Sequence, residues 1–342
     1  MKILIVGDAH FKLDLPYSSY IEDRRRGEWE AVKSKLHELA RGCDSVVLLG
    51  DNLNSKHNNS AVIDEFVVFL KGFGGKELHV ISGNHETFGM KTAIDFLKKL
   101  TMPSWNIYTT PRKNEIVPGS GVYGMFVPYL NPAMVSAKDK EEGVIKALER
   151  LKPADILFAH HAITGGTVHS QLVDLFNEIV FPIEPIETMY PRIFAGHLHA
   201  TQELSEKTTM TGSLFTAEVG EEKKYVFIYD TDTKQTEKIE LPERGIYKVV
   251  LPGDILKIEK IPSNSIVKCY ITDRQVDVDE VKQSLQKFDA HVIIEAYPSQ
   301  RTKVHFENGS MDLSLDNILK IYSEAKLIDH ESLRRGFDLI KW

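Results

Sequence analysis

Short apolar runs alternate with helix-period segments over the first 200 residues of the chain. The runs "KILIVGD", "SVVLLGD", "LHVISGN", "DILFAH" and "RIFAGH" each place aliphatic residues in a row and then end in a polar residue. Between them, "WEAVKSKLHEL" carries Trp29, Val32, Leu36 and Leu39 at helical spacing, and "AVIDEFVVFL" and "TAIDFLKKL" have the same period. The alternation predicts stacked strand–helix units and therefore an α/β fold.

After these units the pattern changes to strands and turns. Additional strands are predicted between Ile116 and Leu130, and "KKYVFIYDTDTKQTEKIEL" predicts a hairpin that turns at Asp232 and Thr233. Beyond "LPERG", residues 241–245, the runs "SIVKCYIT", "VDEVKQSLQKF" and "HVIIEAY" predict a strand, a helix and a strand. These three elements are enough for a small α+β domain.

Helical periodicity returns at about Met311 and continues to the last residue. Leu333, Phe337 and Ile340 fall on one face of the final helix, which suits docking on a partner helix pair or closure of the small domain's own core. We predict three parts, which are residues 1–242, 243–310 and 311–342.

Bulk composition is that of an ordinary soluble globular protein. The chain has 342 residues, 42% of them hydrophobic, which allows a large core. Neither a signal peptide nor a membrane-spanning run is recognisable, so a cytoplasmic location is expected. Cys43 and Cys269 have no ligand-like neighbours, and the formal charge of −7 opposes a generally basic nucleic-acid binder.

Five of the predicted strands end in residues that bind hard or borderline metal ions. These residues are Asp8 and His10 in "GDAH", Asp51 in "GDN", Asn84 and His85 in "GNHE", His160 in "FAHH", and His197 and His199 in "GHLH". The carboxyl ends of strands in an open α/β sheet face a common crevice, so these side chains are expected to converge. Imidazole, carboxylate and amide ligands without thiolate suit manganese, iron or zinc.

The ligands are numerous enough for two ions. Two cations about 3.5 to 4 Å apart need a shared negative charge, and Asp51 is the best candidate for the bridge. Such a site suits in-line attack on phosphorus. A strand-end Gly-Asp alone is usually a turn, so the prediction depends on the ordered set of five motifs. His160 and His161 stay alternatives, because a shift of one residue in strand register exchanges them.

These five motifs resemble those of the calcineurin-like metallophosphoesterase superfamily, across roughly residues 1 to 200. The resemblance implies a β-sandwich flanked by helices. It also implies one ion held by Asp8, His10, Asp51 and His199, and a second ion held by Asp51, Asn84, His160 and His197. His85 is then expected to contact the scissile phosphate and to protonate the leaving oxygen. His160 is preferred over His161 because family members place the ligand directly after the apolar run.

Within the superfamily the layout resembles the SbcD-type nuclease subunit, which works with an SbcC-type coiled-coil ATPase. The ligand spacing, the small α+β domain and the helical tail carry this resemblance, and the compact length resembles phage-type members. It implies a DNA repair and recombination nuclease, with exonuclease action on double-stranded ends and possible single-strand endonuclease action. Two divalent ions are implied, with Mn²⁺ first and Mg²⁺, Fe²⁺ or Zn²⁺ as alternatives. A homodimer within a heterotetramer is also implied, through helices near residues 60–72 and 89–100.

One position departs from the nuclease pattern. Asn54 stands where nuclease members often carry a histidine, and this puts assistance to His85 from that position in doubt. The segment "GDNLNSK" also lacks the Asp-Arg-Gly of the protein phosphatases. A small-molecule phosphodiesterase or phosphatase stays the first rival, and a subunit that mainly positions DNA is the second.

DNA contacts are predicted at the "RRR" run, Arg24, Arg25 and Arg26, with a solvated helix start as the alternative. Lys257 and Lys260, or the ATPase partner, are further sources of phosphate binding. Among other candidates, loop residues His57 and His169 are expected to be solvated, and His79 is expected to be structural. Glu86 either orients His85 or is exposed.

Overall fold

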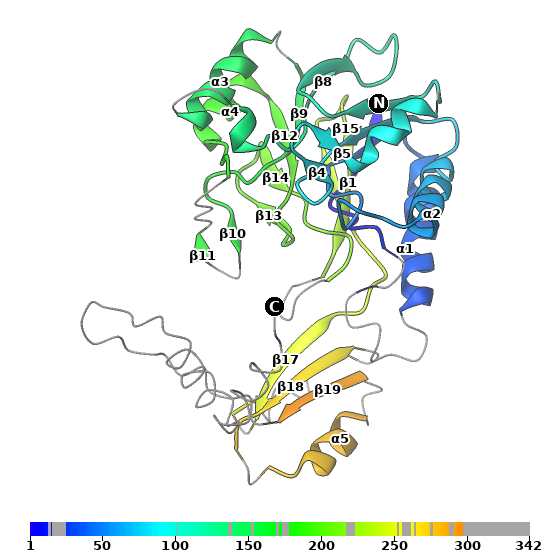
Figure 1. The fold of residues 1–342 in the computed structure, drawn as a ribbon, viewed down its shortest axis with the longest axis vertical. Helices are drawn as coiled ribbons and strands as arrows, with labels where there is room; N and C mark the ends of the chain where they lie inside the picture. The colour runs from blue at the N-terminus through cyan, green and yellow to red at the C-terminus, as the bar shows by residue number, and fades with distance from the viewer. Residues whose placement is uncertain are drawn as a thin grey trace, which may run out of the picture. The chain divides into compact units, whose positions relative to one another are not determined.

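The computed structural model describes most of the chain. The described residues are 1–12, 15, 25–100, 102–135, 139–151, 154–168, 171–172, 178–216, 223–251, 253–254, 261–262, 265–273, 276–286 and 291–296. Residues singled out above that lie outside these ranges are Arg24, His169, Lys257, Lys260, Leu333, Phe337 and Ile340. The first of two compact units contains Met1–Tyr247, and the second begins at Lys248 (Figure 1).

A six-stranded sheet forms half of the first unit, in the order β16-β15-β1-β2-β3-β6. Its strands are β1 (Lys2–Val6), β2 (Ser45–Leu48), β3 (Glu77–Ile81), β6 (Trp105–Tyr108), β15 (Tyr225–Asp230) and β16 (Thr236–Glu240). The strands β1, β2, β3 and β6 are parallel, and β15 pairs antiparallel with β1. The hairpin predicted from the sequence is present, because β15 and β16 pair antiparallel.

A second six-stranded sheet has the order β13-β14-β12-β9-β8-β7. Its strands are β7 (Arg112–Glu115), β8 (Tyr123–Val127), β9 (Ile156–His160), β12 (Arg192–Gly196), β13 (Gln202–Glu203) and β14 (Thr208–Met210). Its central strands β14, β12, β9 and β8 are parallel, and the two outer strands are antiparallel to their neighbours.

The two sheets pack face to face, and alternate residues of each strand enter different cores. Ile3 and Ile5 of β1 pack between the sheets, together with Phe158 of β9 and Phe194 of β12. Leu4 belongs instead to the core on the outer face of the first sheet. Because both faces of these strands are buried, their sequences are continuous apolar runs.

Helices cover the two outer faces of this sandwich (Figure 1). They are α1 (Arg26–Arg41) and α2 (Ser60–Lys71) over the first sheet, and α3 (Lys140–Arg150) and α4 (Ile183–Met189) over the second. Trp29, Val32 and Leu36 are buried on one face of α1, as their spacing predicted. The predicted β-sandwich flanked by helices is therefore confirmed.

The segment "TAIDFLKKL" differs from its prediction in helix type. It forms a 3₁₀ helix, η2 (Ala93–Lys99), rather than an α-helix. Thr92 caps it and Asp95 bonds back to the Thr92 backbone, so a capping box starts a turn that stays short. Minor elements are β4 (Thr87–Phe88), β5 (Lys91–Thr92), η3 (Pro132–Met134), β10 (Thr167–Val168) and β11 (Gln171–Leu172).

A three-stranded sheet with the order β17-β18-β19 follows "LPERG". Its strands are β17 (Ile246–Leu251), β18 (Ile266–Ile271) and β19 (His291–Ala296), and α5 (Val278–Gln286) lies between β18 and β19 in sequence. The predicted strand, helix and strand are thus present, while the bounds 242 and 310 stay predictions. Among the described residues, no helix has the length and apolar character needed to span a membrane.

Candidate metal centre

Loops at the carboxyl ends of strands from both sheets bring the predicted metal ligands together. The backbone N–H of His197, after β12, donates to both carboxylate oxygens of Asp8, after β1, at 3.1 and 3.0 Å. The cluster contains all seven predicted ligands, Asp8, His10, Asp51, Asn84, His160, His197 and His199.

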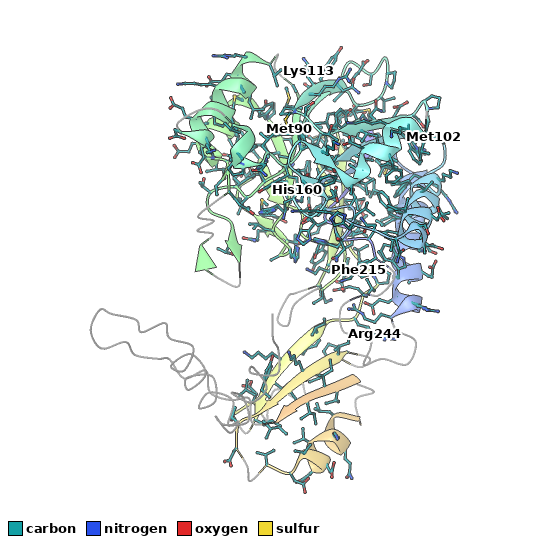
Figure 2. All side chains as sticks on the ribbon, in the orientation of Figure 1. Met90, Met102, Lys113, His160, Phe215 and Arg244 are labelled. Carbon is teal, nitrogen blue, oxygen red and sulfur yellow. The ribbon has the colours of Figure 1, made fainter. Side chains whose placement is uncertain are left out.

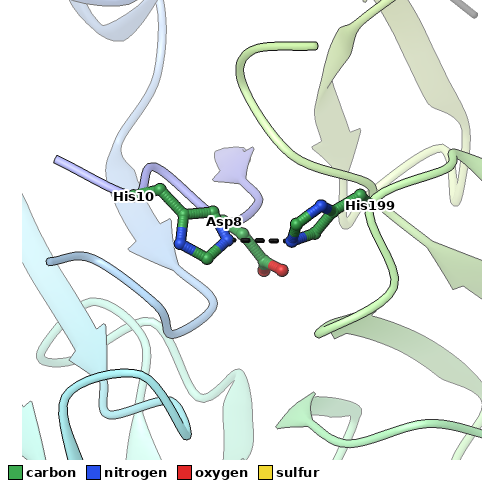
Figure 3. Close-up of side chains that lie close together, drawn as sticks. All are labelled: Asp8, His10 and His199. Atoms are coloured by element: carbon green, nitrogen blue, oxygen red, sulfur yellow. Dashed lines mark hydrogen bonds between the residues drawn. The ribbon is translucent and has the colours of Figure 1, made fainter. Parts of the chain in front are cut away.

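Asp8, His10 and His199 form one half of the cluster (Figure 3). The Nε2 atoms of His10 and His199 lie 2.9 Å apart, with the rings at 74° to each other. Two ring nitrogens cannot both direct lone pairs at each other without a proton or a cation between them. Neighbouring nitrogen ligands on one ion, each about 2.1 Å from it, are separated by about 3 Å, so this pair fits a metal ion.

The carboxyl group of Asp8 supports the same interpretation. Its side chain is fully buried. Burial, and then the negative charge of Asp51, raise the pKa of Asp8 well above its usual range. A divalent cation would offset both effects, because it stabilises two neighbouring carboxylates in their ionised form.

The other half of the cluster is centred on the Oδ1 atom of Asn84. His160 Nε2 lies 2.9 Å from this oxygen, and His197 Nδ1 lies 3.0 Å from it. The Oδ1 atom of Asp51 is 3.4 Å from His160 Nε2. Two imidazoles, one amide oxygen and one carboxylate therefore face a common point, and this set suits a borderline divalent ion.

Asp51 lies between the two halves, as the predicted bridge requires. Its Oδ1 atom faces His160, while its Oδ2 atom is 3.8 Å from His10 Nε2 and 3.9 Å from His85 Nε2. Burial acts to raise the pKa of Asp51, but the imidazoles of His160, His10 and His85 outweigh it and lower that pKa. The carboxylate is therefore ionised at neutral pH and carries the charge that two cations would share.

His160 and His161 have separate environments. His160 Nδ1 donates to the carbonyl oxygen of Leu49 at 2.7 Å, which leaves Nε2 directed at the cluster. His161 points away, because its Nε2 accepts from the backbone N–H of Leu130 and its Nδ1 contacts the carbonyl oxygen of Ile179. The register of β9 thus places His160 in the cluster. Figure 2 labels His160 within the first unit.

Glycines of the motifs make room for side chains from other motifs. A Cβ atom on Gly50 would collide with the His160 ring, and one on Gly83 would collide with Asp51. Three of the clustered residues also have positive φ angles, which are 42° at His10, 44° at Asp51 and 94° at His197. Such backbone conformations are costly away from glycine and concentrate at functional sites.

His85 lies at the rim of the cluster. Its side chain is 43% exposed, and its ring meets that of His10 edge-on at 4.7 Å. Its Nδ1 atom contacts the carbonyl oxygen of Asn54 at 3.2 Å. Because a backbone atom makes this contact, it does not depend on which side chain stands at position 54. A pocket of about 180 Å³ opens beside His85, lined also by Leu15 and Phe215.

Glu86 is buried, so the expectation that it is exposed is wrong, and a role in orienting His85 stays a prediction. Its fully buried carboxylate accepts hydrogen bonds from Asn52 Nδ2 at 2.8 Å, Leu53 N at 2.9 Å and Gly83 N at 3.1 Å. It therefore joins the "GDN" loop to the "GNHE" loop. Burial, and then the charge of Asp51, raise the pKa of Glu86 to about 8.

Two residues next to the cluster had no signal in the sequence. Glu178 Oε2 lies 2.8 Å from His197 Nε2, on the side of the ring away from Asn84. Lys224 is buried, and its Nζ donates to the carbonyl oxygen of His199 at 2.8 Å and to Ser213 Oγ at 3.0 Å. Neither belongs to a spaced motif, so only the fold could place them here.

The arginine run near the first motif has mixed surroundings. Arg25 is fully buried and pairs with Glu28, and its Nη2 atom is 3.8 Å from Glu243. Arg26, the first residue of α1, is exposed. Contact with DNA stays a prediction for this run, but the guanidinium of Arg25 is engaged inside the protein.

Two further histidines lie outside the metal cluster. His57 is exposed, and its ring stacks on Phe88 with centroids 6.4 Å apart. His79 is buried and structural, as predicted. Its ring nitrogens contact the Tyr108 hydroxyl at 2.9 Å and the Ile116 carbonyl oxygen at 2.7 Å.

Sequence comparison identifies the family. Residues 1–201 match the calcineurin-like phosphoesterase family, so more than half of the chain is covered and the chain belongs to this family. Its members use divalent metals to hydrolyse phosphoesters, and the chain is therefore a metal-dependent phosphoester hydrolase. A search among curated proteins found no match to it.

Two solved structures are similar to this chain at low sequence identity. One is the crystal structure of TT1561 of Thermus thermophilus, with a TM-score of 0.42 and 15% identity over 70% of this chain and 98% of that chain. The other is the structure of a novel archaeal phosphodiesterase, with a TM-score of 0.35 and 17% identity over 70% of this chain and 100% of that chain.

Proposed function

We propose that the chain is a two-metal DNA phosphodiesterase, the nuclease subunit of an SbcCD-like complex that processes double-strand breaks. It would act as an exonuclease on double-stranded ends and as an endonuclease on single strands. Mn²⁺ is the proposed ion at both sites, with Mg²⁺, Fe²⁺ and Zn²⁺ as alternatives. The proposal includes a cytoplasmic location, in the host cytoplasm if the chain is of phage origin.

The observation that carries the two-metal part is the position of Asp51. Its two carboxylate oxygens face different sets of imidazoles, with His160 on one side and His10 on the other. A carboxylate placed in this way can be shared by two cations. We assign the first ion to Asp8, His10, Asp51 and His199, and the second to Asp51, Asn84, His160 and His197.

His85 is proposed to act on the leaving oxygen. Its side chain is exposed at the rim of the cluster, and its Nε2 atom lies on the side of Asp51 Oδ2. The bound ions would supply polarisation of the phosphoryl group and activation of the attacking water. His85 would then contact the scissile phosphate and donate a proton to the departing oxygen.

The choice of DNA as substrate depends on the sequence resemblance and on the small second unit. The resemblance to SbcD-type nucleases includes a DNA-capping domain, and the sheet β17-β18-β19 with α5 occupies the corresponding part of the chain. An SbcC-type ATPase as partner and a homodimer within a heterotetramer complete the proposal. The net charge of −7 makes a partner that contributes phosphate contacts more necessary.

A substrate panel with manganese tests this proposal. The full chain is incubated with linear double-stranded DNA, single-stranded circular DNA and bis-p-nitrophenyl phosphate, with and without an SbcC-type ATPase. Nuclease action is expected on both DNAs and is expected to stop when EDTA removes the metal. A His85→Asn variant, assayed alongside, controls for contaminating nucleases, because added manganese is not expected to restore its cleavage.

Each rival gives a different pattern in the same panel. Hydrolysis of the small phosphodiester without any DNA cleavage, in the presence or absence of the ATPase, would replace the proposal with a small-molecule phosphodiesterase. DNA binding without hydrolysis of any substrate would favour a subunit that positions DNA for its partner.

A further inference from the structure

The two ring nitrogens of His197 have different partners. Nδ1 lies 3.0 Å from Asn84 Oδ1, inside the cluster, and Nε2 lies 2.8 Å from Glu178 Oε2, outside it. A neutral imidazole has one protonated nitrogen and one nitrogen with a lone pair. The group that accepts the proton of one nitrogen therefore determines that the other nitrogen can bind a metal.

Glu178 cannot itself be a ligand of the same ion in this arrangement. Its carboxylate contacts the nitrogen on the outer side of the His197 ring, while Asn84 Oδ1 lies beside the inner nitrogen. The ring therefore separates Glu178 from the point that Asn84 and His160 face. Glu178 is in the position of an outer partner that orients a metal-binding histidine.

The backbone beside Glu178 is held in place by His161. The next residue, Ile179, is buried, and its carbonyl oxygen lies 3.1 Å from His161 Nδ1. His161 Nε2 is 3.0 Å from the backbone N of Leu130, which can only donate, and 3.3 Å from the carbonyl oxygen of Pro128. The shorter contact assigns Nε2 as the acceptor, so Nδ1 carries the proton and donates to Ile179. The adjacent histidines of "FAHH" thus face opposite sides, with His160 in the cluster and His161 behind the segment that carries Glu178.

We propose that Glu178 is a positioning residue for the metal centre. It accepts the Nε2 proton of His197 and so directs the Nδ1 lone pair at the second ion, and His161 anchors it through Ile179. This inference rests on the proposed ligand set, since it concerns how one ligand of the second ion is oriented. It does not depend on the identity of the phosphoester substrate.

Metal binding gives the first test. Manganese binding to the metal-free full chain is measured by calorimetry and by elemental analysis after dialysis, for wild type, Glu178→Ala and Glu178→Gln. Glu178→Ala is expected to weaken binding of the second ion by about 10- to 100-fold, the usual effect of removing such a partner, and to leave the first ion unchanged. Glu178→Gln is expected to lose less affinity for the second ion, because its amide oxygen still accepts the hydrogen bond from His197.

Glu184→Gln is the matched control, because Glu184 is an exposed glutamate in the nearby helix α4. It should bind both ions as wild type does. Wild-type affinity for both ions in Glu178→Ala would overturn the proposal. An equal loss of affinity for both ions would overturn the proposal as well, since that result indicates a general disturbance of the site.

The tautomer of His197 gives a test that needs no metal. Nitrogen NMR of the metal-free chain, with the His197 signals assigned by their loss in His197→Gln, is expected to show the proton on Nε2 in wild type. In Glu178→Ala the two tautomers should both be populated. An unchanged Nε2 tautomer in that variant would contradict the proposed role of Glu178.

The anchor is tested separately with His161→Gln, measured by the same calorimetry together with thermal unfolding. We expect His161→Gln to bind the second ion more weakly, to bind the first ion as wild type does, and still to unfold cooperatively. Unchanged affinity for the second ion would remove His161 from the proposal. Failure of the proposed nuclease function has a different signature. Wild type would then cleave no DNA, while Glu178→Ala would still lose the second ion selectively.

Discussion

His85 differs from the other imidazoles of the cluster because nearly half of its side chain is exposed, at 43%. The ligand sets for both proposed ions are complete without it. Replacing it by asparagine should therefore keep the metals and remove the proton donor. We expect His85→Asn to lower single-turnover DNA cleavage by about 10²- to 10⁴-fold, the usual range for general acid catalysis, at all manganese concentrations.

His57→Asn is the control for this variant, because His57 is an exposed histidine that stacks on Phe88 outside the cluster. Its cleavage rate should stay near that of wild type. The Nε2 atom of His85 also lies close enough to His10 and Asp51 to share an ion with them. Loss of a metal from His85→Asn in elemental analysis would thus show that His85 is a ligand and not the acid.

Asp51→Asn should behave differently from His85→Asn. The change removes the charge that both ions would share, so metal occupancy itself should fall. Added manganese should then partly restore cleavage, whereas it should not restore cleavage in His85→Asn. Manganese content and cleavage rate across one titration measure both effects, and full occupancy in Asp51→Asn at low manganese would contradict the bridging role.

At the scale of single elements, the start of helix α1 depends on a buried charge. Arg25 is the N-cap residue, has a φ of 58°, and places its guanidinium between Glu28 and Glu243. Arg25→Ala would remove the buried cation between these carboxylates, while Glu28 would keep Arg244 Nε at 3.8 Å and Glu243 would keep its hydrogen bonds from Thr216. We expect the free energy of unfolding, measured by urea denaturation, to fall by about 3 to 5 kcal/mol.

Arg26→Ala is the matched control, because Arg26 is exposed in the first turn of the same helix. Its effect on the free energy of unfolding should stay within about 0.5 kcal/mol. The same variant tests the predicted DNA contact. Weaker DNA binding in Arg26→Ala, with a smaller salt dependence, would support that prediction. For Arg25→Ala, an unchanged free energy of unfolding would show that the ion pairs of Arg25 do not stabilise the protein.

At the scale of the whole molecule, the partner prediction concerns the helix predicted at the end of the chain, whose residues lie outside the described ones. The sequence spacing of Leu333, Phe337 and Ile340 would place them on one face of that predicted helix. If this face docks on the ATPase, Phe337→Glu should abolish association in a pull-down assay, since a charge cannot be buried in an apolar groove without a large cost. Manganese-dependent cleavage of short DNA should persist.

Arg335→Glu controls for the added negative charge, because helical spacing would place Arg335 on the opposite face of the predicted helix. It should still bind the partner. Loss of solubility or of basal cleavage in Phe337→Glu would indicate that the apolar face closes the small domain's own core.

The sequence was sufficient for the strands that carry the motifs and for the set of clustered residues, whereas β6 and β7 were not predicted. Strands such as β1 and β9 are buried on both faces, so their apolar runs are unambiguous. Asp8, Asp51 and His160 stand at the ends of such runs, and residues at strand ends converge in this kind of sheet. The position of each residue at the end of an apolar run was therefore enough to identify the members of the cluster.

The tertiary structure decided how each side chain is used, because those roles depend on contacts between residues far apart in sequence. The register of β9 decided that His160 faces the cluster and His161 the Ile179 carbonyl. Glu86 is buried and its hydrogen bonds link two motif loops. Arg25 is buried as well. Glu178 belongs to no motif, and only the tertiary structure brings it to His197, in the loop after β12.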